Sequence, residues 1–138
     1  LTSADPSHAD LYRKNLKRFL ADIDRLDHRI KQQLRDRKGQ SFMVYHPAWS
    51  YFARDYGLVQ IPIETDGKDP SPAGIASIIR QAEEGNITVI FASPEYSTKS
   101  ADVIAKEIGG SVVLVSPLEE DYLGNMRNVS QAFIQGGQ

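Results

Sequence analysis

The first 38 residues carry the longest amphipathic pattern in the chain. Apolar side chains recur there at spacings of three and four, with charged residues between them: Tyr12, Leu16, Phe19, Ile23, Leu26, Ile30 and Leu34. This spacing predicts one helix that begins at Asp5-Pro6, a suitable N-cap and first helical residue, and ends near Lys38-Gly39. At 1.5 Å per residue it would be roughly 48 Å long, against a diameter of roughly 37 Å for a compact domain of this size. The helix should therefore overhang its own domain.

Beyond this helix, short apolar runs alternate with amphipathic segments. The runs are Phe42–Tyr45, Leu58–Ile63, Ile87–Ala92 and Ser111–Val115. Uninterrupted apolar runs predict strands that are covered on both faces, and Pro62 favours an edge position or a bulge for the second strand. Segments 49–56, 72–84, 98–108 and 120–135 predict helices. The alternation predicts an α/β fold, with a four-stranded parallel sheet sandwiched by helices and preceded by one long N-terminal helix.

Composition excludes several classes of protein. The chain has 138 residues, enough for one domain with a proper core, and its 41% hydrophobic and 25% charged content is ordinary for a globular protein. Its net charge of −2 provides no basic surface, so nucleic acid is not an expected partner. The absence of cysteine excludes disulfides, thiolate ligands and a cysteine nucleophile.

Candidate chemistry follows three of the four strands. His46 follows the first, Ser93-Pro94-Glu95 the third and Ser116-Pro117 the fourth. Because the carboxyl ends of parallel strands meet at one edge of a sheet, these loops should converge. An imidazole with nearby carboxylates is typical of a site for a divalent transition metal.

Simpler interpretations stay open on the residues alone. A lone histidine at a strand end is commonly a hydrogen-bonded structural residue, and no HxH or HExxH spacing is present. The acidic run Glu119 to Asp121 suits a helix N-terminus, with metal ligation as the alternative. Trp49 and its aromatic neighbours Tyr51 and Phe52 suit packing. An enzyme that uses His46 as a general base lacks a nucleophile motif, so no catalytic residue is expected.

The run FMVYHPAWSYFARDYGL, residues 42–58, is the most specific motif. It resembles the C-terminal lobe of the zinc- and manganese-type substrate-binding proteins of ABC importers. Other segments match in order. Residues 5–34 resemble the rigid backbone helix that joins the two lobes of that family, 70–72 a helix start, 91–97 the third-strand loop and 117–122 the final loop. The resemblance spans nearly the whole chain.

The resemblance implies a division into residues 1–39, the backbone helix, and residues 40–138, the C-terminal metal-binding lobe, with the N-terminal lobe absent from this chain. In that family the metal lies between the lobes, held by two histidines of the N-terminal lobe and two residues of this one. His46 matches the first of these, and histidine there goes with zinc, whereas manganese members more often have glutamate.

The chain departs from the family pattern at the second ligand. An aspartate usually precedes Pro-Leu, where this chain has Ser116, and Glu-Pro is usual where it has Ser93-Pro94. Glu95 and Glu119 are the carboxylates that could substitute, while Trp49, Ser93 and Ser116 would line the site. With these ligands the chain by itself is expected to bind metal weakly.

The resemblance also implies partners and a location. The expected function is capture of a divalent transition metal, with zinc favoured over manganese, for delivery to an ABC permease. The protein would be periplasmic or extracellular and held at the membrane by the transporter or by a lipid anchor. Without the N-terminal lobe, apolar residues of the long helix should be bare or buried in a dimer. The alternative function is an adhesin, or a binder of a non-metal ligand, on the same scaffold.

Overall fold

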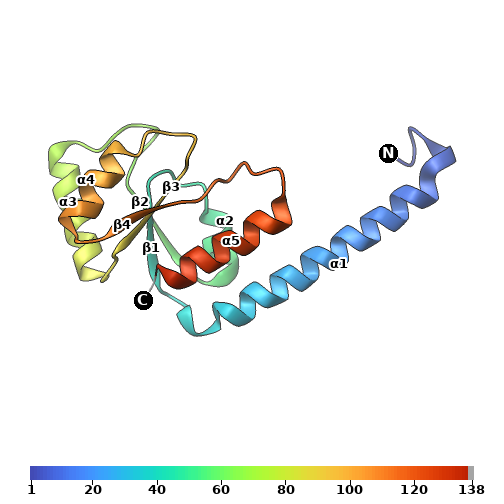
Figure 1. The fold of residues 1–138 in the computed structure, drawn as a ribbon, viewed down its shortest axis with the longest axis horizontal. Coiled ribbons are helices and arrows are strands. Elements are labelled where there is room, and N and C mark those ends of the chain that lie inside the picture. The colour runs from blue at the N-terminus through green and yellow to red at the C-terminus, as the bar shows by residue number, and fades with distance from the viewer. Residues whose placement is uncertain (137–138) are drawn as a thin grey trace.

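Four parallel strands form the centre of the fold (Figure 1). The structure is a computed structural model and describes residues 1–136. The strands are β1 (Ser41–Val44), β2 (Val59–Pro62), β3 (Val89–Ala92) and β4 (Ser111–Leu114), in the order β2-β1-β3-β4. The chain therefore runs from β1 to a neighbour on one side and then crosses to the other side. This reversal falls between β1 and β3, which is where ligand sites of open α/β sheets form.

Helices cover both faces of the sheet (Figure 1). They are α1 (Ala9–Gln33), α2 (Ser50–Tyr56), α3 (Pro72–Glu84), α4 (Lys99–Glu107) and α5 (Tyr122–Gln135). One apolar cluster joins α1, α2 and α5 to the sheet, and a second joins α3 and α4 to its other face. The predicted α/β sandwich is confirmed. None of these helices within residues 1–136 is long and apolar enough to cross a membrane.

Phe133 of α5 is the centre of the aromatic packing on the first face. Its ring lies 4.4 Å from that of Phe91, 4.6 Å from Phe42, 5.1 Å from Phe52 and 6.0 Å from Trp49, between centroids. Such aromatic pairs each add about 0.5–1.5 kcal/mol beyond the burial of their area. This cluster fixes α5 and α2 against β1 and β3, the two strands that flank the reversal.

The long helix is anchored at one end only. Leu26, Ile30 and Leu34 are buried, whereas Leu16 and Phe19 nearer the N-terminus are 57% and 46% exposed. Figure 1 shows α1 projecting away from the sheet, as the predicted overhang requires. The large aliphatic and Phe side chains of its N-terminal half, Leu11, Leu16, Phe19 and Leu20, are exposed, as predicted for a helix without a partner there.

The ends of the first helix differ from the prediction. The α-helical part stops at Gln33, short 3-10 turns (Pro6–His8 and Arg35–Arg37) flank it, and Gly39 adopts a positive φ of 79° where the chain turns. The expected N-cap at Asp5 is wrong in one respect, because its side chain makes no capping bond. Its carboxylate instead accepts hydrogen bonds from the Tyr12 phenol at 2.8 Å and the Ser7 hydroxyl at 2.6 Å.

The strands and their edges follow the sequence closely. β2, β3 and β4 are one or two residues shorter than their apolar runs, whereas β1 has the length of its run and begins one residue earlier. Pro62 lies on β2, an edge strand, as predicted. Asp121 caps α5 by accepting a hydrogen bond from the Gly124 amide at 3.0 Å, which agrees with the helix N-terminus expected for the acidic run.

Candidate metal-binding site

His46 and Glu64 lie side by side, just past the carboxyl ends of the neighbouring strands β1 and β2. The pairing of β1 with β2 continues past the strand ends, where the Ile63 amide donates to the Val44 carbonyl at 2.8 Å and the Glu64 amide to the Tyr45 carbonyl at 3.1 Å. This extension places Glu64 beside the residue that follows Tyr45, which is His46.

The two side chains are hydrogen-bonded. His46 Nδ1 lies 2.6 Å from Glu64 Oε1, and the side chains are 40% and 12% exposed, respectively. A carboxylate can only accept, so a neutral imidazole in this contact carries its proton on Nδ1. Nε2 then holds the free lone pair. The Tyr96 ring, from the loop after β3, lies 5.4 Å from the imidazole between centroids.

A second cluster joins the loops after β3 and β4. The hydroxyls of Ser93 and Ser116, both buried, donate hydrogen bonds to the two carboxylate oxygens of Glu95. The Ser116 hydroxyl also accepts from the Leu118 amide at 3.1 Å. The Ser116 hydroxyl, and to a smaller extent the Ser93 hydroxyl, lower the pKa of Glu95, because both stabilise its ionised form. Glu95 is thereby held as an anion at the carboxyl edge of the sheet.

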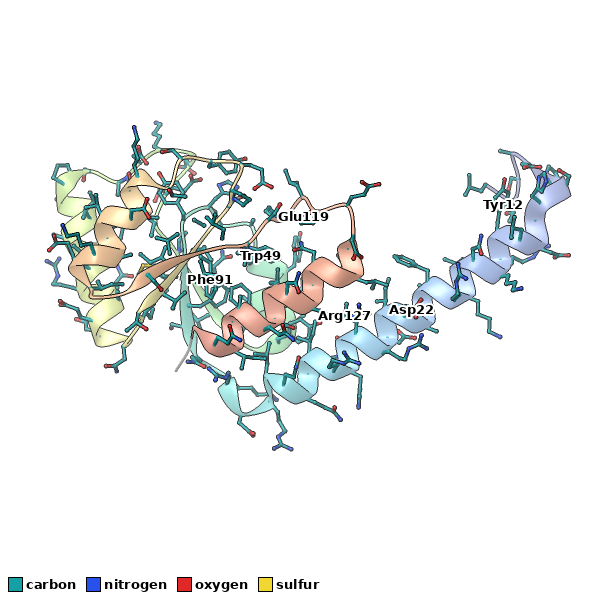
Figure 2. All side chains as sticks on the ribbon, viewed as in Figure 1. Tyr12, Asp22, Trp49, Phe91, Glu119 and Arg127 are labelled. Atoms are coloured by element: carbon teal, nitrogen blue, oxygen red, sulfur yellow. The ribbon has the colours of Figure 1, made fainter. Side chains whose placement is uncertain are left out.

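The predicted convergence of loops is confirmed by these contacts. Tyr96 links the β3 loop to His46, and Glu95 links it to Ser116 of the β4 loop. Glu119 is exposed in the loop before α5 and lines a hollow of about 340 Å³ with Ser116 and Asp121. Figure 2 labels Glu119 on this loop.

The aromatic residues near His46 divide into two groups. Trp49 is buried and packs edge-on against Phe52 and Phe133, so it belongs to the aromatic core. Its backbone amide donates to the Gln60 side chain at 2.9 Å. Tyr51, in contrast, is exposed and lies against the Arg54 guanidinium, at 5.0 Å from the ring centroid.

The donor set suits part of a zinc site. Imidazole nitrogen and carboxylate oxygen are zinc ligands, and a zinc ion in a protein usually takes four ligands. Within residues 1–136 no three His, Cys, Asp or Glu side chains come together closely enough to hold a metal. Residues from elsewhere would have to complete the coordination.

Glu64 is a residue of the candidate site that sequence reasoning missed. It follows the second apolar run directly, but only the pairing of β2 with β1 brings it to His46. Its signal in the sequence is its place directly after an apolar run, at the carboxyl end of a strand.

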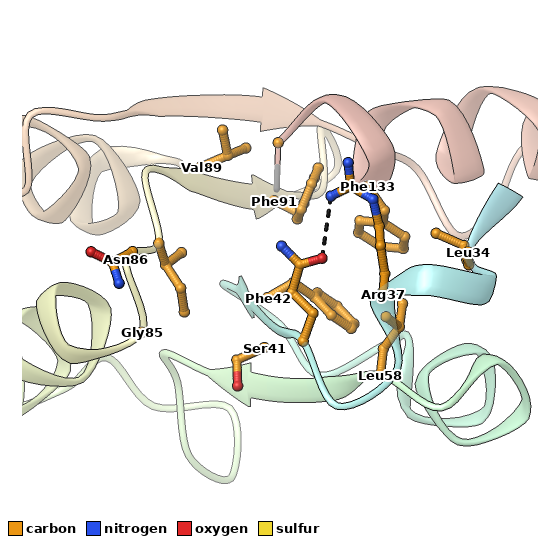
Figure 3. A pocket seen from close by; sticks show the side chains of 13 residues that line it. Leu34, Arg37, Ser41, Phe42, Leu58, Gly85, Asn86, Val89, Phe91 and Phe133 are labelled. Carbon is orange, nitrogen blue, oxygen red and sulfur yellow. Dashed lines mark hydrogen bonds between the residues drawn. The ribbon is translucent and has the colours of Figure 1, made fainter. Parts of the chain in front are cut away.

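A separate cavity lies at the opposite edge of the sheet (Figure 3). It measures about 30 Å³, and its lining includes Ser41 and Val89, the first residues of β1 and β3. Arg37 donates a hydrogen bond to Gln40 at 3.2 Å beside it. Its volume suits a water molecule, and it is remote from His46 because it adjoins the amino ends of the strands.

Residues 1–136 match the protein family described as zinc-uptake complex component A, periplasmic. The chain belongs to this family. The match covers nearly all of the sequence, which confirms the resemblance to zinc-type substrate-binding proteins.

Relatives and solved structures agree with this family. The high-affinity zinc uptake system protein ZnuA of Bacillus subtilis is 32% identical over 121 residues, which is 86% of this chain and 38% of that protein. A crystal structure of ZnuA is 42% identical, with a TM-score of 0.96 over 99% of this chain and 54% of the other.

A third match combines two activities. The laminin-binding protein Lmb of Streptococcus agalactiae, described as bifunctional with adhesin and metal transporting activity, is 29% identical, with a TM-score of 0.88 over 99% of this chain and 56% of the other. The chain thus spans roughly half, or less, of the length of these family members.

Proposed function

We propose that this chain is the C-terminal lobe of an extracytoplasmic binding protein that captures zinc for an ABC importer. Residues 1–39 would be the backbone helix and residues 40–138 the lobe. Family membership and the zinc-uptake names of the relatives support this proposal. The proposed role is binding and release of an ion, with no catalytic residue.

The observation that carries the proposal is the free Nε2 of His46 at the carboxyl edge of the sheet. Its other ring nitrogen is engaged by Glu64, which is the usual arrangement for a histidine that binds zinc. Glu95, held by Ser93 and Ser116, would supply a carboxylate at the same edge. Glu119 is the alternative carboxylate, on the loop that follows Ser116.

Two ligands from this lobe leave two to be supplied by the N-terminal lobe. Zinc bound between the lobes would then become four-coordinate only when they close on it. Binding to this lobe alone should be weak for that reason. Histidine in place of glutamate at position 46 favours zinc over manganese, because imidazole suits zinc and oxygen donors suit manganese.

The bare apolar face of α1 supports the existence of another folded body. Leu11, Leu16, Phe19 and Leu20 are all exposed on the overhanging half. The N-terminal lobe of the same protein is proposed to cover this face, and a second copy of this chain is the alternative. The proposed destination of the zinc is a membrane permease, and the proposed location is periplasmic or extracellular, with attachment through the transporter or a lipid anchor.

Ser93 and Ser116 favour a second candidate function, that of an adhesin. These hydroxyls stand where the family pattern has carboxylates, and a neighbour of the same fold is described as an adhesin as well as a metal transporter. An adhesin on this scaffold would not need a complete metal site. It predicts normal folding and no zinc uptake.

Zinc titration by calorimetry distinguishes the two functions. The full-length polypeptide proposed to contain this chain should bind one zinc, and His46→Ala should weaken binding by more than about 100-fold, since loss of an outer-shell partner alone typically costs 10–100-fold. His28→Ala, an exposed histidine on α1, is the matched control and should bind as the parent does. Absence of zinc binding, or an unchanged His46→Ala variant, would refute the transport proposal.

A further inference from the structure

The geometry points to Glu64 as a positioning residue for His46. We propose that its carboxylate holds the imidazole with the proton on Nδ1 and with Nε2 directed away from Glu64, ready for a metal ion. This inference rests on the proposed function for the role of Nε2. The orientation itself is a property of the metal-free protein.

The backbone makes Glu64 a fixed partner. Its amide donates to the Tyr45 carbonyl at 3.1 Å, so its backbone is held beside the residue that precedes His46. The side chain is only 12% exposed, and its carboxylate accepts from His46 Nδ1 at 2.6 Å. A carboxylate that is largely removed from water needs such a donor, because unpaired charge is costly to bury.

Tyr96 restricts the imidazole further. Its ring lies 5.4 Å from that of His46 and is inclined by 36°. Rotation of the imidazole to exchange its two nitrogens would break the bond to Glu64. Two neighbours, from the segments that follow β2 and β3, therefore restrict the plane of the imidazole, and Glu64 also sets its tautomer.

The expected consequence is a gain in metal affinity through preorganisation. A histidine that already presents its unprotonated nitrogen has no tautomer change or rotation to make when zinc arrives. A carboxylate on the other nitrogen also makes the imidazole a more basic ligand, and loss of such a partner typically weakens metal binding by 10–100-fold.

The first test is made without metal. In the full-length polypeptide labelled with ¹⁵N-histidine, at a pH where the imidazole is neutral, His46 should show protonated Nδ1 and unprotonated Nε2, with its signals assigned by their loss in His46→Gln. Glu64→Ala should lose this tautomer. Glu64→Gln should keep it, because the amide oxygen can still accept from Nδ1–H.

Asp66→Asn is the matched control. Asp66 lies in the same loop with a positive φ of 53°, a conformation that asparagine tolerates, and its side chain is exposed. This variant should leave the His46 tautomer unchanged. Protonated Nε2 in the parent protein, or an unchanged tautomer in Glu64→Ala, would overturn the proposal.

Zinc affinity provides a second, separate readout. Glu64→Ala should bind zinc about 10–100-fold more weakly than the parent, and Glu64→Gln should fall between the two. If the protein took up no zinc but the tautomer followed Glu64 as expected, the transport function would fail and the positioning role would stand. If zinc bound equally well to parent and Glu64→Ala, the positioning role would fail and the transport function would stand.

Discussion

The phenol of Tyr56 in α2 donates a hydrogen bond to Oδ1 of Asp27 in α1, at 3.2 Å. Burial raises the pKa of Tyr56, and the negative charge of Asp27 adds to this effect. Asp27 also pairs with Lys31 one turn further along the helix, at 2.7 Å. This hydrogen bond joins α1 to α2, and on α1 it lies directly after the buried residue Leu26.

Replacing Tyr56 by Phe should weaken this contact in a pH-dependent way. At neutral pH we expect a loss of about 1 kcal/mol in the free energy of unfolding, a typical value for a hydrogen bond. Because the folded-state pKa is raised, the stabilisation is complete below the usual tyrosine pKa of about 10 and is lost as pH rises beyond it.

Urea unfolding of this chain from pH 7 to pH 11 checks the prediction. The alkaline loss of stability should be less steep in Tyr56→Phe than in the parent. Tyr51→Phe, at an exposed position on the same helix, should match the parent throughout. Equal alkaline slopes in parent and Tyr56→Phe would contradict the assignment.

Phe133→Ala should strongly destabilise the lobe. The ring contacts four other aromatic rings, and removal of a buried Phe typically costs about 3–5 kcal/mol through lost burial and the cavity that remains. Phe19→Ala is the control, since Phe19 is 46% exposed on the overhanging half of α1, and it should change stability by less than about 0.5 kcal/mol. Similar urea midpoints for both variants would show that the aromatic cluster is misplaced.

Gly110→Ala should disturb the pairing of β3 with β4. A Cβ at this position would lie 2.0 Å from the carbonyl oxygen of Thr88, which accepts a hydrogen bond from the Ser111 amide at 2.9 Å. We expect about 1–3 kcal/mol of destabilisation, as for other overpacked positions. Gly109→Asn should have a smaller effect, because Gly109 has open space and a positive φ of 65° that asparagine tolerates. Thermal unfolding of the two variants makes the comparison.

Ser116→Ala should weaken zinc binding by the full-length protein through Glu95. The variant loses the hydroxyl that donates to one carboxylate oxygen, so Glu95 is held by Ser93 alone. A loss of about 10-fold or more is expected, as for other outer-shell partners. Ser97→Ala, an exposed serine in the same loop as Glu95, should bind zinc normally. Calorimetry on both variants tests the role of Glu95, and an unchanged affinity in Ser116→Ala would exclude it.

Hydrophobic periodicity was enough to predict the sheet, its parallel strands and the overhanging helix. It could not predict which hydrogen bonds the side chains form at the ends of helices. Asp5 is a residue type that commonly caps helices. Its carboxylate instead accepts a hydrogen bond from the phenol of Tyr12, seven residues further along the chain. Competing local partners of this kind depend on the three-dimensional path of the chain near a helix end.

The site was predictable only in part. His46 followed from its place after an apolar strand, but Glu64 required the order of the strands, which no local pattern encodes. Ser93 and Ser116 depart from the family pattern and are expected only to line the site, since serine is a poor zinc ligand. The structure shows that both hydroxyls donate to Glu95, so their contribution depends on a third residue.

The one-sided anchoring of α1 makes the helix a lever. Its fulcrum is the buried stretch from Leu26 to Leu34, and Tyr12 lies about 27 Å from Ile30 at 1.5 Å per residue. A tilt of only about 5° at the fulcrum would carry the Tyr12 end through about 2.4 Å over that length. Small changes in packing beneath Leu26 would thus be magnified at the far end, so the aromatic cluster around Phe133 sets how accurately any body seated on the helix faces His46.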